Sequence, residues 1–182
     1  MGTHRRLIPC AMVGALVALA LVGCAPQGHP VVASAPPKVY PPVVTDPKVV
    51  ESVGAALAAL DPQSYRAVSM AEVGGTVLLT GAVVRPDLRR HVEQRIATVP
   101  GVTAVSNHIL VTDGGALDGY RPDQTKEKDL SVWMTPGLAV RVVRGVAYLV
   151  GVAPAEDVDK FKENVADDPA IQWVDATAVI LR

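Results

Sequence analysis

The feature of this sequence that most constrains its fold is an internal repeat at an offset of 70 residues. In chain order, the recurring residues are Gly75, Leu79, Gly81, Asp87 and Glu93, which match Gly145, Leu149, Gly151, Asp157 and Glu163. After a one-residue deletion, Pro100 and Val105 match Pro169 and Val174. Self-similarity at a fixed period is typical of one supersecondary unit used more than once. We therefore expect two similar small units rather than one large domain.

The first unit is predicted over residues 46–113, with the element order αββαβ. Asp46 and Pro47 suit a helix N-cap and first helical position, and apolar residues then recur at helical spacing up to Asp61-Pro62. Residues 66–73 and 76–83 are predicted strands, because Gly74-Gly75 between them is typical of a two-residue hairpin turn. A second helix is expected from Pro86 to Pro100-Gly101, followed by a third strand at 102–112.

The second unit is predicted over residues 123–182, after a glycine-containing linker at 114–122. Arg144-Gly145 is its predicted hairpin turn, and a helical stripe follows at Val158, Phe161 and Val165. Its first helix is the weak part of the pattern, because residues 129–134 offer only a short candidate.

Residues 1–23 have the pattern of a removable secretory signal. A short basic region precedes an apolar stretch, 7–22, that is shorter than the roughly 20 residues that span a bilayer. The stretch ends in Leu21-Val22-Gly23-Cys24, which resembles the bacterial lipobox. The resemblance implies cleavage before Cys24 and attachment of fatty acyl chains, such as palmitate, to that residue. A plain signal peptide followed by a coincidental cysteine is the alternative.

Residues 24–45 are rich in proline and are predicted to be an extended spacer, because such a segment forms neither a helix nor a central strand. Cys24 is followed by Ala25 rather than by the Asp that, in the enteric sorting rule, retains lipoproteins in the inner membrane. By that resemblance, we expect a lipid-anchored protein at the periplasmic face of the outer membrane.

The repeated motifs carry a resemblance to a known family. The glycine-bounded hairpin, the L-x-G pair (Leu79-Thr80-Gly81 and Leu149-Val150-Gly151) and P-G-V-x-x-V at 100–105 resemble the BON domain. The resemblance implies an α+β fold of two tandem αββαβ domains, each a three-stranded mixed sheet with both helices on one face. The second copy departs from the pattern at Pro169-Ala170-Ile171. The whole architecture is similar to outer-membrane lipoproteins of the dual-BON type.

No catalytic motif stands out, so we expect a protein that is not an enzyme and has no cofactor. The formal charge of −1 gives no indication of nucleic-acid binding. His29, His91 and His108 are not spaced as metal ligands and are interpreted as solvated surface residues. No metal site is expected.

Strand alternation assigns the faces of each predicted sheet. Val77 and Leu79 should face the helices, whereas Thr76, Leu78 and Thr80 should form a solvated face. In the second unit, Ala147 and Leu149 should face the helices. The outward set is Val146, Tyr148 and Val150, joined by Val143 and Val179 with Arg141 nearby. This outward set is either an exposed contact surface or a surface that packs against the first domain or the linker.

Two further groups are candidates for binding. The second predicted helix carries Arg89, Arg90 and Arg95, together with Arg85. These arginines either form a solvated face, with an Arg89–Glu93 pair, or attract anionic head groups. The BON resemblance links anionic phospholipid to the first helix of the second domain, where this chain has Lys126, Lys128, Trp133 and Met134. Trp133 suits an interfacial anchor or a core residue that closes a short helix.

The second unit, with seven basic and ten acidic side chains in 123–182, has a net charge of −3, which weakens the expectation of lipid binding there. The resulting hypothesis is a non-enzymatic, lipid-anchored envelope protein that binds anionic phospholipid and supports outer-membrane integrity. The alternatives are a periplasmic adaptor, which binds another envelope protein through the Val146, Tyr148 and Val150 face, and a purely structural protein that protects the envelope under stress.

Overall fold

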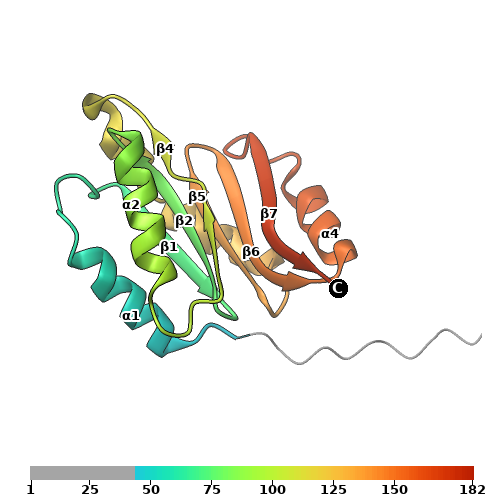
Figure 1. Cartoon of the computed structure of the whole chain (residues 1–182). Helices are drawn as coiled ribbons and strands as arrows, with labels where there is room; N and C mark the ends of the chain where they lie inside the picture. The colour runs from blue at the N-terminus through green and yellow to red at the C-terminus, as the bar shows by residue number, and fades with distance from the viewer. Residues whose placement is uncertain (1–43) are drawn as a thin grey trace, which may run out of the picture. The chain divides into compact units, whose positions relative to one another are not determined.

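The computed structural model describes residues 44–182, all of which belong to one compact unit. The predicted signal (1–23), Cys24 and the predicted spacer up to residue 43 lie outside the described residues. The described part is mixed α+β, with two sheets and four α-helices (Figure 1). None of these helices is long and apolar enough to cross a membrane.

The first half contains α1 (Pro47–Ala58), β1 (Val68–Val73), β2 (Thr76–Val83), α2 (Pro86–Ala97), β3 (Ala104–Asn107) and β4 (Leu110–Val111). The Asp46 side chain caps α1 by accepting a hydrogen bond from Lys48 N at 2.9 Å, as predicted. Gly74 and Gly75 have φ values of 61° and 82°, which a two-residue hairpin turn requires. The sequence therefore predicts the hairpin correctly.

A 3₁₀ segment, η1 (Gly114–Tyr120), leads to the second half. This half contains α3 (Gln124–Leu130), a 3₁₀ turn η2 (Ser131–Trp133), β5 (Leu138–Val143), β6 (Val146–Ala153), α4 (Ala155–Val165) and β7 (Trp173–Leu181). The hairpin turn at Arg144-Gly145 is confirmed, with φ values of 50° and 77°. The first helix begins earlier than predicted, because Asp123 caps it by accepting from Lys126 N at 3.0 Å.

The two sheets share one topology. β1 pairs antiparallel with β2, and β3 and β4 both pair parallel with β2. β5 pairs antiparallel with β6, and β7 pairs parallel with β6. The predicted continuous strand at 102–112 is wrong in detail, since it is interrupted at His108 and Ile109, between β3 and β4. There the Asn107 side chain accepts a hydrogen bond from Ile109 N at 3.1 Å.

Each sheet buries one face against its helices. On the first sheet this core includes Val77 and Leu79 with Val53, Val92 and Ile96. On the second sheet it includes Ala147 and Leu149 with Val158, Phe161 and Val165. The helix-facing sets predicted from strand alternation are therefore confirmed.

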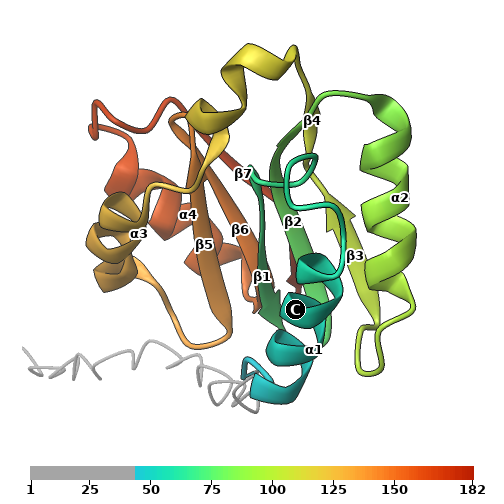
Figure 2. The same cartoon turned by 90° about the vertical axis from the view of Figure 1, so that its left-hand side faces the viewer.

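The remaining faces of the two sheets pack against each other and form a third core. Leu78 and Ala71 of the first sheet meet Val143, Tyr148 and Val150 of the second. Figure 2 shows the strands between α2 on one side and α3 and α4 on the other. The prediction of a solvated face at Thr76, Leu78 and Thr80 is wrong, because all three are buried.

The segment predicted as a linker at 114–122 also takes part in this third core. It forms η1, and its Leu117 and Tyr120 are buried between the sheets. Burial of these two side chains fixes the connection against the sheets, so this segment is not a free tether between the two halves.

Val179 is the one member of the predicted outward set that faces the opposite way. A register shift in β7 lies between the partners of Tyr148 and Val150, so that Tyr148 pairs with Asp175 but Val150 pairs with Ala178. The extra residue reverses the alternation beyond it. Ala178 therefore joins the core between the sheets, and Val179 packs on the helix side.

Candidate functional site

The most exposed apolar pair on the second half is at η2. Val132 is 73% exposed and Trp133 48% exposed. The neighbours on either side are fixed inward, because Leu130 is buried and Met134 packs against the same core. The short turn is closed by hydrogen bonds from Ser131 Oγ to Lys128 O (2.6 Å) and from Met134 N to Ser131 O (3.2 Å). This local geometry leaves both apolar side chains at the surface.

Trp133 is therefore not a core residue, and the second of its two interpretations is wrong. An exposed indole beside an exposed valine suits an interface between water and lipid. Met134, the other predicted site residue of this segment, is only partly exposed and mainly supports the turn. Val132 was not among the predicted site residues, although two adjacent apolar residues after a polar helix could have indicated it.

The two lysines near η2 differ in their surroundings. Lys128 is exposed, and its side chain has no hydrogen bond or ion pair within residues 44–182. Lys126 Nζ lies 3.2 Å from Asp168 Oδ2 and 3.9 Å from Asp129 Oδ2. The charge of Lys126 is thus largely used inside the protein, and Lys128 is the cation available to a partner.

Tyr148 and Val150 lie in the core between the sheets, with exposed fractions of 9% and 0%. Val143 is buried with them and Val146 is partly buried against the same core. Of the two alternatives, packing against the first half is the one that holds. The outward set is not an exposed contact surface.

Arg141 connects the two sheets. Its Nε and Nη2 donate to Met70 O of β1 at 3.0 and 2.7 Å, and its Nη1 lies 2.7 Å from Glu127 Oε2 of α3. Glu127 Oε1 also accepts from Val142 N at 3.0 Å. The guanidinium and the carboxylate hold each other in place, so Arg141 acts in the structure rather than as a free cation.

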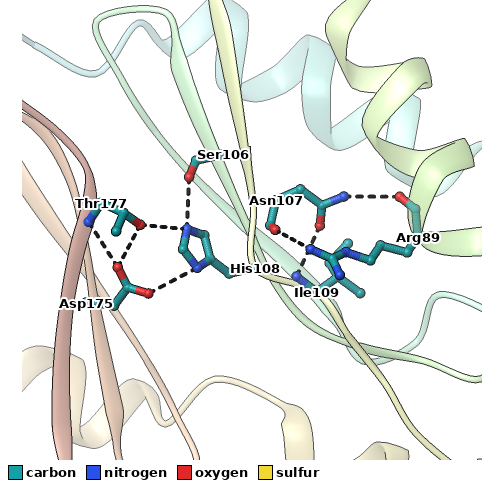
Figure 3. A network of polar contacts seen from close by, with 7 residues as sticks. All are labelled: Arg89, Ser106, Asn107, His108, Ile109, Asp175 and Thr177. Carbon is teal, nitrogen blue, oxygen red and sulfur yellow. Dashed lines mark hydrogen bonds and ion pairs between the residues drawn. The ribbon is translucent and has the colours of Figure 1, made fainter. Parts of the chain in front are cut away.

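A second polar connection lies at the interruption between β3 and β4 (Figure 3). His108 Nδ1 is 3.2 Å from Asp175 Oδ2 of β7, and His108 Nε2 is 2.9 Å from Ser106 Oγ and 3.2 Å from Thr177 Oγ1. The imidazole lies 5.2 Å from the Tyr148 ring. The expectation that His108 is a solvated surface residue is wrong, because the break in the strand turns it toward the second sheet.

The arginines of α2 lie on the outer side of the first sheet. Arg89 Nη2 donates to Asn107 O at 3.0 Å (Figure 3). Asn107 in turn donates to Glu93 Oε2 at 2.8 Å, so Asn107 bridges the predicted Arg89–Glu93 pair. Arg85 is 2.5 Å from Asp87, and its hydrogen bond and charge lower the pKa of that carboxyl. Arg90 and Arg95 are exposed, and their side chains have no partner in the described part of the chain.

Comparison with known families decides the nature of the first half. Residues 45–113 match the family model described as BON domain. A BON domain is present in this chain. The BON domain family is non-enzymatic, which is consistent with the absence of catalytic motifs in the sequence. The BON domain thus contains α1, α2 and the first sheet, with the α2 arginines on its outer helix layer.

Solved structures add two similar chains, both of CdsD from Chlamydia trachomatis, a structural protein of the type III secretion system. The C-terminal domain of CdsD is 13% identical, with a TM-score of 0.30 over 76% of this chain and 100% of that chain. A second CdsD structure is 14% identical, with a TM-score of 0.30 over 74% and 92%. A comparison with curated proteins finds no match.

The structure does not bring the predicted site residues together. Trp133 and Met134 belong to the outer layer of the second half, whereas Arg89, Arg90 and Arg95 belong to the outer layer of the BON domain, across both sheets. Arg141, Tyr148 and Val150 lie between these layers. No group of His, Cys, Asp or Glu side chains within residues 44–182 is arranged to hold a metal ion.

Proposed function

We propose that this protein is a non-enzymatic envelope protein that binds anionic phospholipid through η2, with Val132 and Trp133 entering the interface and Lys128 beside them. The observation that carries the proposal is the exposed pair Val132 and Trp133, held outward between Leu130 and Met134. The BON domain supports it, since this domain is found in envelope-associated, phospholipid-binding proteins.

The proposal includes the arrangement of the whole chain. The second half has the element order of a BON domain and is proposed to be a second, divergent copy. Cys24 is proposed to carry the lipid anchor that holds both domains at the periplasmic face of the outer membrane, with residues 25–43 as the spacer. Binding to the membrane surface would then support envelope integrity.

Apolar burial at η2 contributes more free energy to membrane binding than a single basic side chain does. Burying an apolar side chain of this size in an apolar environment contributes about 1.5–3 kcal/mol, and one basic side chain near an anionic surface contributes about 1 kcal/mol. Val132 and Trp133 therefore outweigh Lys128. They also compensate for the net charge of −3 over residues 123–182, which opposes approach to an anionic membrane.

The adaptor alternative loses the surface on which it was based. Val146, Tyr148 and Val150 pack against the BON domain, so a protein partner cannot reach them in this arrangement. No other observation favours an adaptor, and we retain one proposed function.

Liposome flotation tests the proposal with a fragment from Tyr40 onward, which contains every described helix, strand and core. The fragment lacks Cys24, so flotation reports on η2 and not on the anchor. We expect flotation with vesicles that contain phosphatidylglycerol and little with phosphatidylcholine alone. Equal flotation with both compositions, or none with either, would show that anionic lipid is not the ligand.

A matched pair of tryptophan variants locates the contact. The chain has two tryptophans, and both are exposed, Trp133 by 48% and Trp173 by 67%. Trp133→Ser should lower vesicle binding about tenfold, because interfacial burial of the indole is lost. Trp173→Ser, at the start of β7, should leave binding unchanged. Equal losses in both variants would place the contact elsewhere.

A further inference from the structure

A hollow of about 250 Å³ opens between the two sheets, at the end where β5 turns into β6. Its apolar wall is formed by Leu110, Val143 and Val146. Its polar lining is formed by Tyr120, Arg144, Tyr148 and Gln172. No aspartate or glutamate is among these lining residues, although acidic residues are common in this half of the chain.

Tyr148 is one of the residues that line this hollow, and its hydroxyl has no hydrogen-bond partner among the described residues. Tyr148 has an exposed fraction of 9%, and its ring packs beside His108. Within residues 44–182, Thr135 Oγ1 is the one fully buried side-chain polar atom that has no hydrogen-bond partner. The Tyr148 hydroxyl has no partner either, so it is not fully buried and must reach open space. Tyr148 lines the hollow, so the hollow is the candidate for that space.

Arg144 supplies the positive charge at the rim. Its guanidinium carbon lies 4.7 Å from the centre of the Tyr120 ring, and its Nη1 donates to the Tyr120 hydroxyl at 2.6 Å. These contacts fix the guanidinium over the ring and leave its other N–H groups without a partner in the described residues. Burial and, to a smaller extent, the charge of Asp175 raise the pKa of the Tyr148 hydroxyl. The Asp175 carboxylate is itself bound to His108 and Thr177.

We propose that this hollow binds a small organic anion, with a carboxylate or phosphate group at Arg144 and the Tyr148 hydroxyl and a short apolar stem against Val143 and Val146. Guanidinium and hydroxyl donors are the groups that bind such anions, and a lining without carboxylates does not repel them. A water molecule would satisfy the hydroxyl but would leave the apolar wall and the remaining guanidinium donors unused.

The size of the hollow limits the ligand. Its volume lies below the roughly 300–1,000 Å³ of sites for drug-sized ligands, so the site accepts one short chain or one ring and not a two-chain lipid. It is also distant from η2, because η2 precedes the start of β5 whereas the hollow lies at its end. The site is therefore separate from the proposed membrane contact.

The test is a titration of the ¹⁵N-labelled fragment from Tyr40 onward with hexanoate, with hexyl phosphate and with uncharged hexanol, followed by amide chemical shifts. At least one anion should shift the amides around residues 143–148 and should bind at least tenfold more tightly than hexanol. The two anions distinguish a carboxylate ligand from a phosphate ligand. Absence of shifts with both anions, or equal binding of hexanol, would overturn the proposal.

Variants then test the two donors. Tyr148→Phe keeps the ring and should weaken anion binding about tenfold or more, because it removes one hydrogen bond to a charged group. Arg144→Gln should abolish the preference for an anion over hexanol, whereas Arg144→Lys should retain it. Tyr65→Phe, at a tyrosine of the BON domain that contacts His91, is the control and should change nothing. Unchanged binding in Tyr148→Phe would contradict the proposed geometry even if the Arg144 variants failed to fold.

Discussion

At Gly81, the backbone of β2 passes so close to the chain entering β1 that a side chain has no room. A Cβ at Gly81 would lie 1.8 Å from Ala67 O, and one at Gly151 would lie 1.9 Å from Gly137 O. Both glycines also have φ values that L-residues rarely adopt, 107° and 135°. The L-x-G pair in the repeat therefore reflects a backbone requirement that is the same in both halves.

Replacing Gly81 should accordingly be costly. We expect Gly81→Ala to lower the free energy of unfolding by at least about 2–3 kcal/mol, measured by urea denaturation, through backbone strain and the clash with Ala67 O. Gly54→Ala is the control. It lies in α1 with nothing within 4 Å of the new Cβ, and should raise stability by about 1 kcal/mol. Similar stability of the Gly81→Ala variant and the unmodified protein would contradict the close approach.

Residue patterns predicted which side of each strand faces the helices and left packing of the opposite side open for the second sheet, but for the first sheet they predicted a solvated face that the structure buries. Thr80 illustrates the reason. Its hydroxyl is 2.8 Å from Ser69 Oγ on the neighbouring strand, so its polar group is satisfied within the sheet and the residue can be buried completely. Polarity alone therefore indicated a solvated face where the structure has a core.

At the scale of elements, α3 shows why hydrophobic periodicity predicted only a short helix at residues 129–134, whereas the structure has the helix at Gln124–Leu130. Leu130 is its one buried residue, and the remainder of the helix is polar. It is held instead by the ion pairs of Glu127 with Arg141 and of Lys126 with Asp168. The capping role of Asp123 was not predicted, although aspartate is a residue type typical of helix N-caps. The register shift in β7 was likewise invisible in the sequence, because no residue type there marks an extra residue.

The Asp168 contact gives α3 a dependence on pH. The N–H of Ala170 and the ammonium of Lys126 lower the pKa of Asp168 from its ordinary value of 3.8. Because the pKa of Asp168 is lower in the folded state, the ionised carboxylate stabilises the fold above pH 3.8. This stabilisation is lost as the pH falls through the folded-state pKa.

Asp168→Asn should therefore make the acid-induced decrease in unfolding free energy shallower between about pH 5 and pH 2, measured by urea denaturation at several pH values. Asp167→Asn is the matched control, since the neighbouring Asp167 is exposed and has no contact in the described residues. An identical pH profile for Asp168→Asn and the unmodified protein would rule out this contribution.

At the scale of the whole described unit, the two sheets act as one body because they share a core. Leu78, Tyr148 and Val150 have exposed fractions of 0%, 9% and 0%, and Arg141 and His108 connect the sheets by polar contacts. The repeat indicated two similar units but could not indicate how they pack, because each unit alone has an open face. Packing those faces together buries the apolar residues on both.

Arg141 should therefore stabilise both halves together. We expect Arg141→Met to lower the free energy of unfolding by about 1.5–3 kcal/mol, because Met70 O and the Glu127 carboxylate lose a charged partner. Arg95→Met, an exposed position in α2, should change it by less than about 0.5 kcal/mol. An equally small effect of both substitutions would show that the contacts of Arg141 with Met70 O and Glu127 contribute nothing to stability.

The most direct test of the proposed function is to ask which tryptophan enters the membrane. On β6, Leu138 pairs with Gly151 and Trp173 pairs with Val146, so Leu138 and Trp173 lie at opposite ends of the second sheet. Trp133 comes just before Leu138 in the chain. The variants Trp173→Phe and Trp133→Phe each leave one tryptophan as a fluorescent probe. With phosphatidylglycerol vesicles that contain brominated acyl chains, we expect quenching of Trp133 in the Trp173→Phe variant and no quenching of Trp173 in the Trp133→Phe variant. Quenching of Trp173, or of neither residue in protein bound to vesicles, would contradict binding through η2.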